Sequence, residues 1–228
     1  MKLSLKVFVF AGLAAVGLTG NVNAQTNTKD AEYRQVVTQR ADKIVKNLGV
    51  SDSVTYKKVR EAIADQYVNL NVVHDGRNAE VKKVKELYKN DKEKADAEVK
   101  KLEANADKKL AKLHKKYIAQ LGKHLNAEQI EGVKNGMTYG VLPITYKGYQ
   151  EMLPNLTEEQ KKQILAWLTE AREYAMDAES SDKKHAWFGK YKGRINNYLS
   201  KAGIDMNKEG KAWQERIKAA KAQEKAAN

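Results

Sequence analysis

The sequence contains no cysteine and only two prolines, Pro143 and Pro154, among its 228 residues. Without cysteine the chain can form no disulfide and has no thiol nucleophile, which excludes thiol catalysis and disulfide exchange. Because proline is the strongest helix breaker, its scarcity leaves long windows in which a helix can continue. Long apolar runs are scarce as well. The run from Val7 to Leu18 is shorter than the ~20 residues of a membrane-spanning helix, so we expect no transmembrane segment.

The N-terminus has the three parts of a secretory signal. Lys2 and Lys6 precede the apolar run, and Val22 and Ala24 occupy the −3 and −1 positions of a cleavage site. This pattern predicts a signal peptide over residues 1–24, cleaved after Ala24, and a periplasmic or secreted mature protein. An uncleaved anchor is the alternative. Disulfides are available in such compartments, so a cysteine-free mature chain relies on its apolar core, for which its length is sufficient.

Basic residues outnumber acidic ones, 42 to 29, which gives the chain a net charge of +13. Such a balance favours anionic partners such as acidic polysaccharide, lipopolysaccharide or nucleic acid. Because the protein is predicted to be exported, nucleic acid is the poorer candidate, and we expect no nucleic-acid partner. Six lysines lie between Asp107 and Glu128 with no acid among them. This cluster is consistent with anion docking, and equally with a solvated helix end.

Apolar residues recur every three or four positions through most of the chain, which predicts an all-α fold. A first helix is expected over residues 31–47, and a second one ends at Asp75-Gly76. Residues 78–120 then suggest one very long helix, although its apolar stripe is interrupted near Asp91. We expect residues 25–124 to form an elongated section, with the first two helices forming a hairpin against the long one. The long helix also offers a surface for a homodimer.

The composition changes after Gly122, where glycines, both prolines and several tyrosines accumulate. This predicts a Gly/Pro/Tyr-rich loop over residues 137–153. The loop belongs to a compact helical unit over residues 125–222, followed by a disordered tail at residues 223–228. Helices are expected to resume after the loop, over residues 157–178, 183–202 and 207–220.

Two similar segments begin helices in this second part. They are Leu125-Asn126-Ala127-Glu128-Gln129 and Leu156-Thr157-Glu158-Glu159-Gln160. Each places a capping side chain, Asn126 or Thr157, three residues before a glutamine, which is the pattern of a capping box. Similar Leu-Thr-x-x-Gln motifs occur in small periplasmic helical chaperones. A periplasmic chaperone or envelope-stress adaptor is therefore an alternative function.

Three carboxylates, Glu170, Glu173 and Asp177, lie on one face of a predicted helix. Paired carboxylates can cleave glycosidic bonds or hold a hard cation. The two carboxylates of a glycosidase normally face each other from different elements, so a stripe on one helix is more typical of a solvated face. None of the four histidines forms a zinc-binding motif. We therefore expect no catalytic residue, metal or cofactor.

The stretch over residues 185–198 is the most informative in the chain, with four aromatic residues, one histidine, one arginine and two asparagines. Aromatic faces beside planar polar groups suit sugar rings, which stack on one and hydrogen-bond to the other. The same residues could stack on nucleic-acid bases, or simply form a core helix. As sugar contacts we nominate residues of this stretch and two tyrosines of the loop: His185, Trp187, Tyr191, Arg194, Asn197, Tyr139 and Tyr146.

Five further segments have specific sequences: Gly136-Met137-Thr138-Tyr139-Gly140-Val141, Tyr146-Lys147-Gly148-Tyr149, Glu170-Ala171-Arg172-Glu173-Tyr174-Ala175-Met176-Asp177, Lys184-His185-Ala186-Trp187-Phe188 and Lys192-Gly193-Arg194-Ile195-Asn196-Asn197-Tyr198-Leu199. In these segments the chain resembles a domain-of-unknown-function family of secreted helical proteins from Bacteroides-type bacteria. The resemblance is densest over residues 136–205. It implies a role in polysaccharide use and supplies no catalytic residue.

Together these observations predict an exported, non-catalytic protein that binds a carbohydrate, in particular an acidic one, or assists polysaccharide utilisation. The chaperone or stress adaptor is the alternative. A glycan-cleaving enzyme that uses Glu173 or Asp177 is a third hypothesis.

Overall fold

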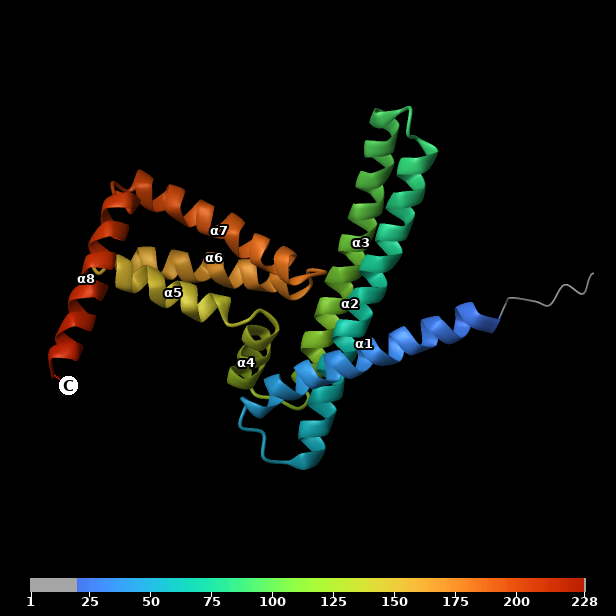
Figure 1. The fold of residues 1–228 in the computed structure, drawn as a ribbon, viewed down its shortest axis with the longest axis horizontal. Helices are drawn as coiled ribbons and strands as arrows, with labels where there is room; N and C mark the ends of the chain where they lie inside the picture. The colour runs from blue at the N-terminus through green and yellow to red at the C-terminus, as the bar shows by residue number, and fades with distance from the viewer. Residues whose placement is uncertain (1–19, 228) are drawn as a thin grey trace, which may run out of the picture.

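The computed structural model describes the backbone of residues 20–227 and the side chains of residues 29–223. Over this range the chain forms eight α-helices and no strand, which confirms the all-α prediction (Figure 1). Residues 1–19 of the predicted signal peptide lie outside the described residues. Within the described range, no helix is both long enough and apolar enough to cross a membrane.

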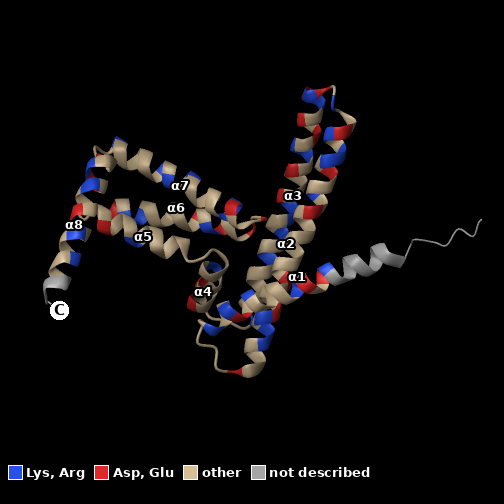
Figure 2. Ribbon diagram, viewed as in Figure 1, with Lys and Arg blue, Asp and Glu red and all other residues tan. Residues whose placement is uncertain are grey.

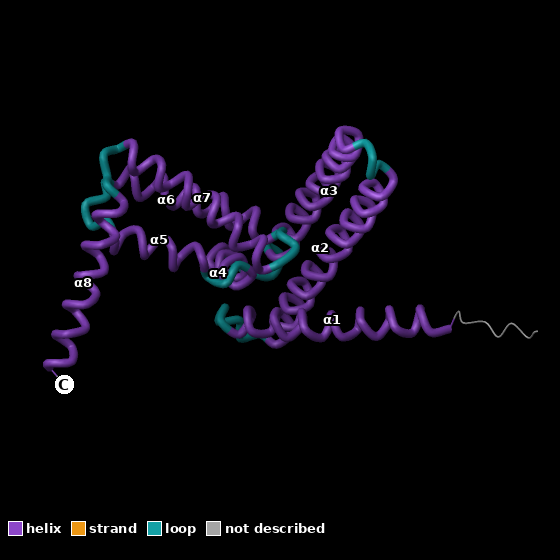
Figure 3. The backbone as a smooth tube through the Cα atoms, turned by 45° about the horizontal axis from the view of Figure 1, so that its top comes forward, coloured by secondary structure: helices purple, strands orange, loops and turns teal. Residues whose placement is uncertain are grey.

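The first three helices form the elongated section. They are α1 (Gly20–Lys46), α2 (Ser53–Leu87) and α3 (Lys92–Leu121). Helices α2 and α3 run antiparallel as a hairpin that projects from the rest of the molecule, and α1 packs across the base of α2 (Figures 1 and 3).

The prediction of a single long helix over residues 78–120 is wrong, because the chain turns just before Asp91. Helix α2 continues through Gly76 to Leu87, and the Asp91 side chain then accepts a hydrogen bond of 3.0 Å from the Lys94 N–H to cap α3. A Cβ at Gly76 would have open space around it. Glycine there costs only the ~1 kcal/mol of its low helix propensity, which does not end the helix.

The remaining five helices form a second layer to one side of the hairpin. They are α4 (Ala127–Met137), α5 (Val141–Met152), α6 (Glu158–Met176), α7 (Ser181–Lys201) and α8 (Met206–Ala227). Helices α6 and α7 are antiparallel, α5 lies along α6, and α8 crosses the end far from the hairpin (Figure 1). Helix α8 includes residues 223–227, so the tail predicted to be disordered is helical up to Ala227.

Most of the loop predicted over residues 137–153 is the helix α5. Gly140 adopts a left-handed conformation with φ of +67° before the helix, and Pro143 is the third residue of α5. A proline in the first turn removes no intrahelical hydrogen bond, since the first N–H groups of a helix have no partner inside it. Only the segment between Met137 and Val141 is therefore a turn.

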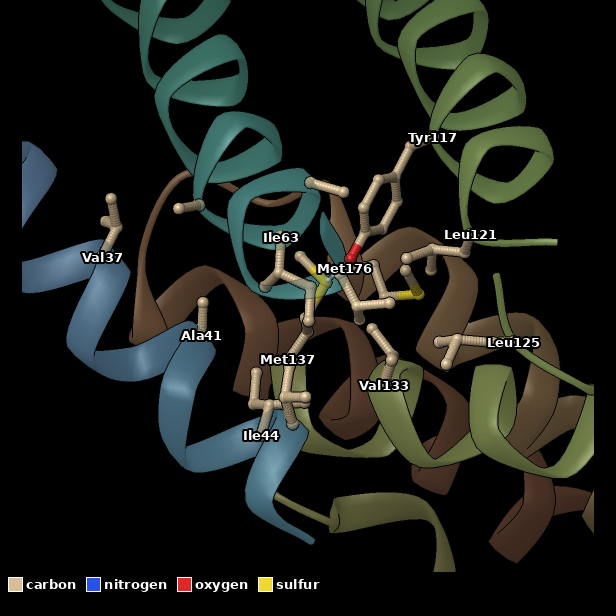
Figure 4. Packing of buried hydrophobic residues seen from close by; sticks show 14 residues of the cluster. Val37, Ala41, Ile44, Ile63, Tyr117, Leu121, Leu125, Val133, Met137 and Met176 are labelled. Atoms are coloured by element: carbon tan, nitrogen blue, oxygen red, sulfur yellow. Dashed lines mark hydrogen bonds between the residues drawn. The ribbon is translucent and has the colours of Figure 1, made fainter. Parts of the chain in front are cut away.

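Two apolar clusters hold the fold together. The first joins α1, α2, the end of α3 and α4 around Ile63, Leu121 and Val133, and it includes Met176 from the end of α6 (Figure 4). The second lies among α5, α6, α7 and α8 and includes Ile164. The outer half of the hairpin belongs to neither cluster and carries charges of both signs along its length (Figure 2).

Candidate functional site

An open groove runs along the solvent side of α6 and α7. The Arg194 Cζ lies 4.6 Å from the centre of the Trp167 ring, and Tyr198 meets Trp167 edge-on with ring centres 5.3 Å apart. The groove has a volume of about 550 Å³. The other lining residues are Lys190, Gly193, Asn197 and Lys201. The lining thus combines two aromatic rings and three cations with no carboxylate.

The cations of the groove are exposed and weakly engaged. The Arg194 side chain is 56% exposed, and its nearest carboxylate is Glu170, with 3.7 Å between Nη1 and Oε2. An exposed pair at this distance contributes little, so Arg194 remains available to an anion. The Lys190 ammonium lies 5.0 Å from the centre of the Trp187 ring. Positions 187, 190, 194, 197 and 201 follow the three- and four-residue spacing of one helix face, so one aromatic ring, three cations and one amide share a side of α7.

Trp187 also forms one wall of a second hollow, which we call the junction cavity. Its ring stacks on Tyr174 with centres 4.6 Å apart and an angle of 16° between planes. The junction cavity has a volume of about 580 Å³ and lies between the α2/α3 hairpin and the facing ends of α6 and α7. Its lining from the hairpin side includes His74 and Asp107, and from α6 it includes Asp177.

Beside this cavity, side-chain contacts tie the hairpin to the end of α6. The His74 Nε2 atom lies 2.7 Å from the Asp177 carbonyl oxygen, and Arg77 pairs with Glu179. The His114 Nδ1 atom lies 2.9 Å from Asp177 Oδ2. His114, which lies in the lysine-rich part of the sequence, is therefore an ion-pair partner with a side chain only 19% exposed.

Glu173 belongs to the same charged cluster. Its Oε2 atom lies 3.1 Å from the Lys134 ammonium and 3.3 Å from His114 Nε2. Burial alone would raise the pKa of Glu173, but the hydrogen bonds from His114 and Lys134 outweigh burial and lower the pKa to about 2. A general acid needs a pKa near the working pH. Glu173 instead stays ionised, and the acidic stripe of α6 has a structural explanation in these ion pairs.

The structure places the seven nominated sugar contacts in separate locations. Trp187, Arg194 and Asn197 line the groove or the junction cavity. Tyr191 is only 6% exposed and packs in the second apolar cluster, which Tyr146 also contacts.

The other two nominated residues form a pair of their own. Tyr139 and His185 stack on each other, with ring centres 5.6 Å apart. Tyr139 also lines a third hollow with Arg40 and Tyr67.

The residues of the groove and the cavity that sequence reasoning missed include Trp167, Tyr174, Lys190, Tyr198 and Lys201. The two lysines could have been found from their spacing, because they share the α7 face of Arg194. Trp167 and Tyr174 are on α6, and only the pairing of α6 with α7 brings them to this surface.

Among the described residues, no group of three or more histidine, aspartate and glutamate side chains is arranged to hold a metal ion. The fold and this surface define an all-α protein with a projecting helical hairpin and an aromatic, basic groove. The chain belongs to the family described as Protein of unknown function (DUF3826), which matches residues 34–219. That range reaches from α1 into α8. No curated protein matches the chain.

Proposed function

We propose that this protein is an exported, non-catalytic carbohydrate-binding protein, accessory to polysaccharide use, and that an acidic glycan binds in the groove between α6 and α7. The observation that carries the proposal is the position of Arg194 over Trp167 in a groove lined by three cations and no carboxylate. The C–H face of a sugar ring packs on an aromatic face, and its carboxylate or sulfate group pairs with guanidinium or ammonium groups.

The residues that line the groove follow α7 for several turns. Lys190 and Lys201 share one face of α7, and the ~1.5 Å rise per residue separates them by about 17 Å. Asn197 lies between them and supplies both a hydrogen-bond donor and an acceptor for sugar hydroxyls. An oligosaccharide of a few units can therefore contact the Trp167 and Tyr198 rings together with the three cations.

The test is a titration of the purified protein, followed by tryptophan emission, with oligogalacturonate and chondroitin sulfate oligosaccharides against neutral cello-oligosaccharides. Lys190→Gln and Arg194→Gln should each weaken acidic-glycan binding roughly ten-fold, the size expected for one charge-assisted hydrogen bond. Lys192→Gln is the matched control, since Lys192 is an exposed lysine of α7 outside the groove. Equal losses in the Lys190 and Lys192 variants, or no binding of any acidic glycan, would contradict the proposal.

Export is part of the same proposal and rests on the N-terminal signal pattern. Expression of the full chain in a Gram-negative host, followed by cell fractionation and N-terminal sequencing, tests it. Gln25 should be the first residue of the mature protein. Retention of the intact N-terminus in the cytoplasmic fraction would contradict export.

The chaperone alternative now has less support from its sequence motifs. Asn126 and Gln129 form a complete capping box at the start of α4, and Thr157 and Gln160 form another at α6. The two similar segments are therefore accounted for by helix initiation. Suppression of client aggregation by the protein in the absence of glycan would favour the alternative again.

A further inference from the structure

The junction cavity differs in chemistry from the groove. We propose that it is a second binding site, specific for a ligand that carries a primary ammonium group on a compact body with an apolar face, as an amino sugar does. This inference does not depend on glycan binding in the groove. It rests on the lining of the cavity, on its charge and on two buried polar atoms beside it that lack hydrogen-bond partners.

The cavity has the size and the mixed walls of a small-molecule site. Its volume of about 580 Å³ lies within the range typical of ligand pockets. The stacked rings of Trp187 and Tyr174 form an apolar wall from α7 and α6. Leu110 and Ala111 of α3 also line the cavity, so a ring-shaped ligand can be held between apolar surfaces contributed by different helices.

The charge of the lining favours a cation. Arg77 is neutralised by its ion pair with Glu179. Glu103 and Asp107, one turn apart on α3, have no ion-pair partner among the described side chains. Lys183 is the remaining cation of the lining. The α3 wall therefore presents two carboxylates that an ammonium group can pair with.

Two buried atoms at the cavity also lack partners. His74 is only 5% exposed, and its Nδ1 atom has no hydrogen-bond partner among the described residues; the same holds for the buried Oδ1 atom of Asp177. Nε2 of His74 faces the Asp177 carbonyl oxygen, which can only accept, so Nε2 carries a proton, and the unpaired carboxylate oxygen of Asp177 is an acceptor. Glu179 Oε2 lies 3.8 Å from Nδ1, beyond hydrogen-bond distance.

The unpaired carboxylates of α3 and the Asp177 oxygen indicate what the ligand must supply. A buried acceptor without a donor is unfavourable, and native structures rarely leave one unsatisfied. An ammonium group carries three N–H donors and a positive charge. It can therefore pair with the carboxylates of α3 while the body of the ligand packs on Trp187.

The test compares ligands that differ only in charge. The full protein is titrated by calorimetry with the glucosamine disaccharide and with its N-acetylated counterpart, which keeps both rings but has no ammonium group. We expect the free amine to bind at least ten-fold more tightly. Spermidine, which has ammonium groups without rings, tests the need for a compact body: weak binding would support an amino sugar, and binding as tight as that of the glucosamine disaccharide would contradict the proposed specificity. Equal affinity for the two disaccharides, or no binding by any amine, would overturn the proposal.

Variants then locate the site. Asp107→Asn should weaken amine binding about ten-fold, whereas Asp96→Asn should not. Asp96 is also exposed and without an ion pair among the described residues of α3, but it lies outside the cavity. Equal effects of the two substitutions would mean that the amine is attracted by the overall negative charge of α3 and not by the cavity, which would contradict the proposal. Lys201→Gln, which alters the groove at the end away from Trp187, should leave amine binding unchanged, so failure of one site is distinguishable from failure of the other.

Discussion

The imidazole of His114 lies between two carboxylates of α6, with Nδ1 2.9 Å from Asp177 and Nε2 3.3 Å from Glu173. One side chain of the hairpin thus holds the last turn of the helix that contributes to both the groove and the junction cavity. Hydrogen bonds to Asp177 and then to Glu173 raise the pKa of His114 to about 9, against the opposing effect of burial. The ring is a cation at neutral pH.

This pKa predicts a loss of stability above neutral pH. The folded-state pKa is raised from 6.5 to about 9, so the stabilisation is fully present below pH 6.5 and is lost as pH rises towards 9. Between pH 6.5 and 8 the free energy of unfolding should fall by up to about 1.4 kcal/mol per pH unit, the slope for one proton. Urea denaturation across this window measures the slope.

The matched variant is His114→Gln, which should remove the slope between pH 6.5 and 8. Lys134 and Arg172 reach the same carboxylate, Glu173. Lys184 is buried, and burial lowers its pKa to about 8, so it contributes an opposite slope that grows as pH approaches 8. The same pH slope in the variant as in the parent would mean that His114 is not the titrating group.

A second prediction concerns Arg172, whose guanidinium is only 1% exposed. It pairs with Glu131 at 2.7 Å and donates a hydrogen bond of 2.9 Å to the Asn135 side chain. Arg172→Ala should destabilise the protein by roughly 3–5 kcal/mol, because it leaves a void and removes one partner of a buried ion pair.

The control for Arg172 is Arg60→Ala. Arg60 forms an ion pair with the neighbouring Glu61 and is 31% exposed, so its removal should cost less than about 1 kcal/mol. Thermal or urea unfolding of both variants gives the comparison. A similar small loss in both would show that the Arg172 contacts do not couple α4 to α6.

Two helical glycines should respond to alanine in opposite directions. A Cβ on Gly136 of α4 would come within 2.9 Å of Ile44 in α1, whereas a Cβ on Gly148 of α5 would meet nothing within 4 Å. Gly136→Ala should therefore destabilise by about 1–3 kcal/mol through overpacking. Gly148→Ala should stabilise by about 0.4–1 kcal/mol, since alanine reduces the entropy of the unfolded chain. If both substitutions changed the free energy of unfolding in the same direction in urea denaturation, the packing of α1 on α4 would be contradicted.

The fold class could be predicted from sequence because its signals are local. Periodic apolar residues and two capping boxes are read directly from the chain, and both boxes are formed at Asn126 and Thr157. The position of the hairpin turn was not predictable in the same way. Gly76 resembles a helix end in sequence, but its exposed position in α2 makes glycine tolerable there.

The candidate site was only partly predictable, because it depends on helix pairing. Phe188, Tyr191 and Ile195 share one buried face of α7, so the alternative of a core helix is correct for that face. The neighbouring exposed side of α7 carries Arg194, whose partner Trp167 comes from α6. His114 and Asp177 are 63 residues apart, and no local pattern indicates that they meet.

The last prediction concerns the outer half of the hairpin, residues 80–102. It belongs to neither apolar cluster, and its ion pairs are exposed contacts within one helix, such as Glu80 with Lys83 and Glu98 with Lys101. Such pairs contribute only tenths of a kcal/mol. In native-state hydrogen exchange at low protein concentration, these amides should open locally and exchange much faster than amides around Ile164.

The same experiment tests the predicted homodimer. The prediction placed the dimer contact on one long helix, and the corresponding surface in the structure is the α2/α3 hairpin. If two hairpins associate, protection of residues 80–102 should rise with protein concentration, while the amides around Ile164 stay unchanged. Protection that is uniformly high in dilute solution would contradict the prediction of an independently opening hairpin, because Ala95 is the one buried apolar residue among the described side chains of residues 80–102. Fast exchange at every concentration would contradict a dimer through the hairpin. Only the inner half of the hairpin would then be held in place, by its contacts with Asp177 and Glu179.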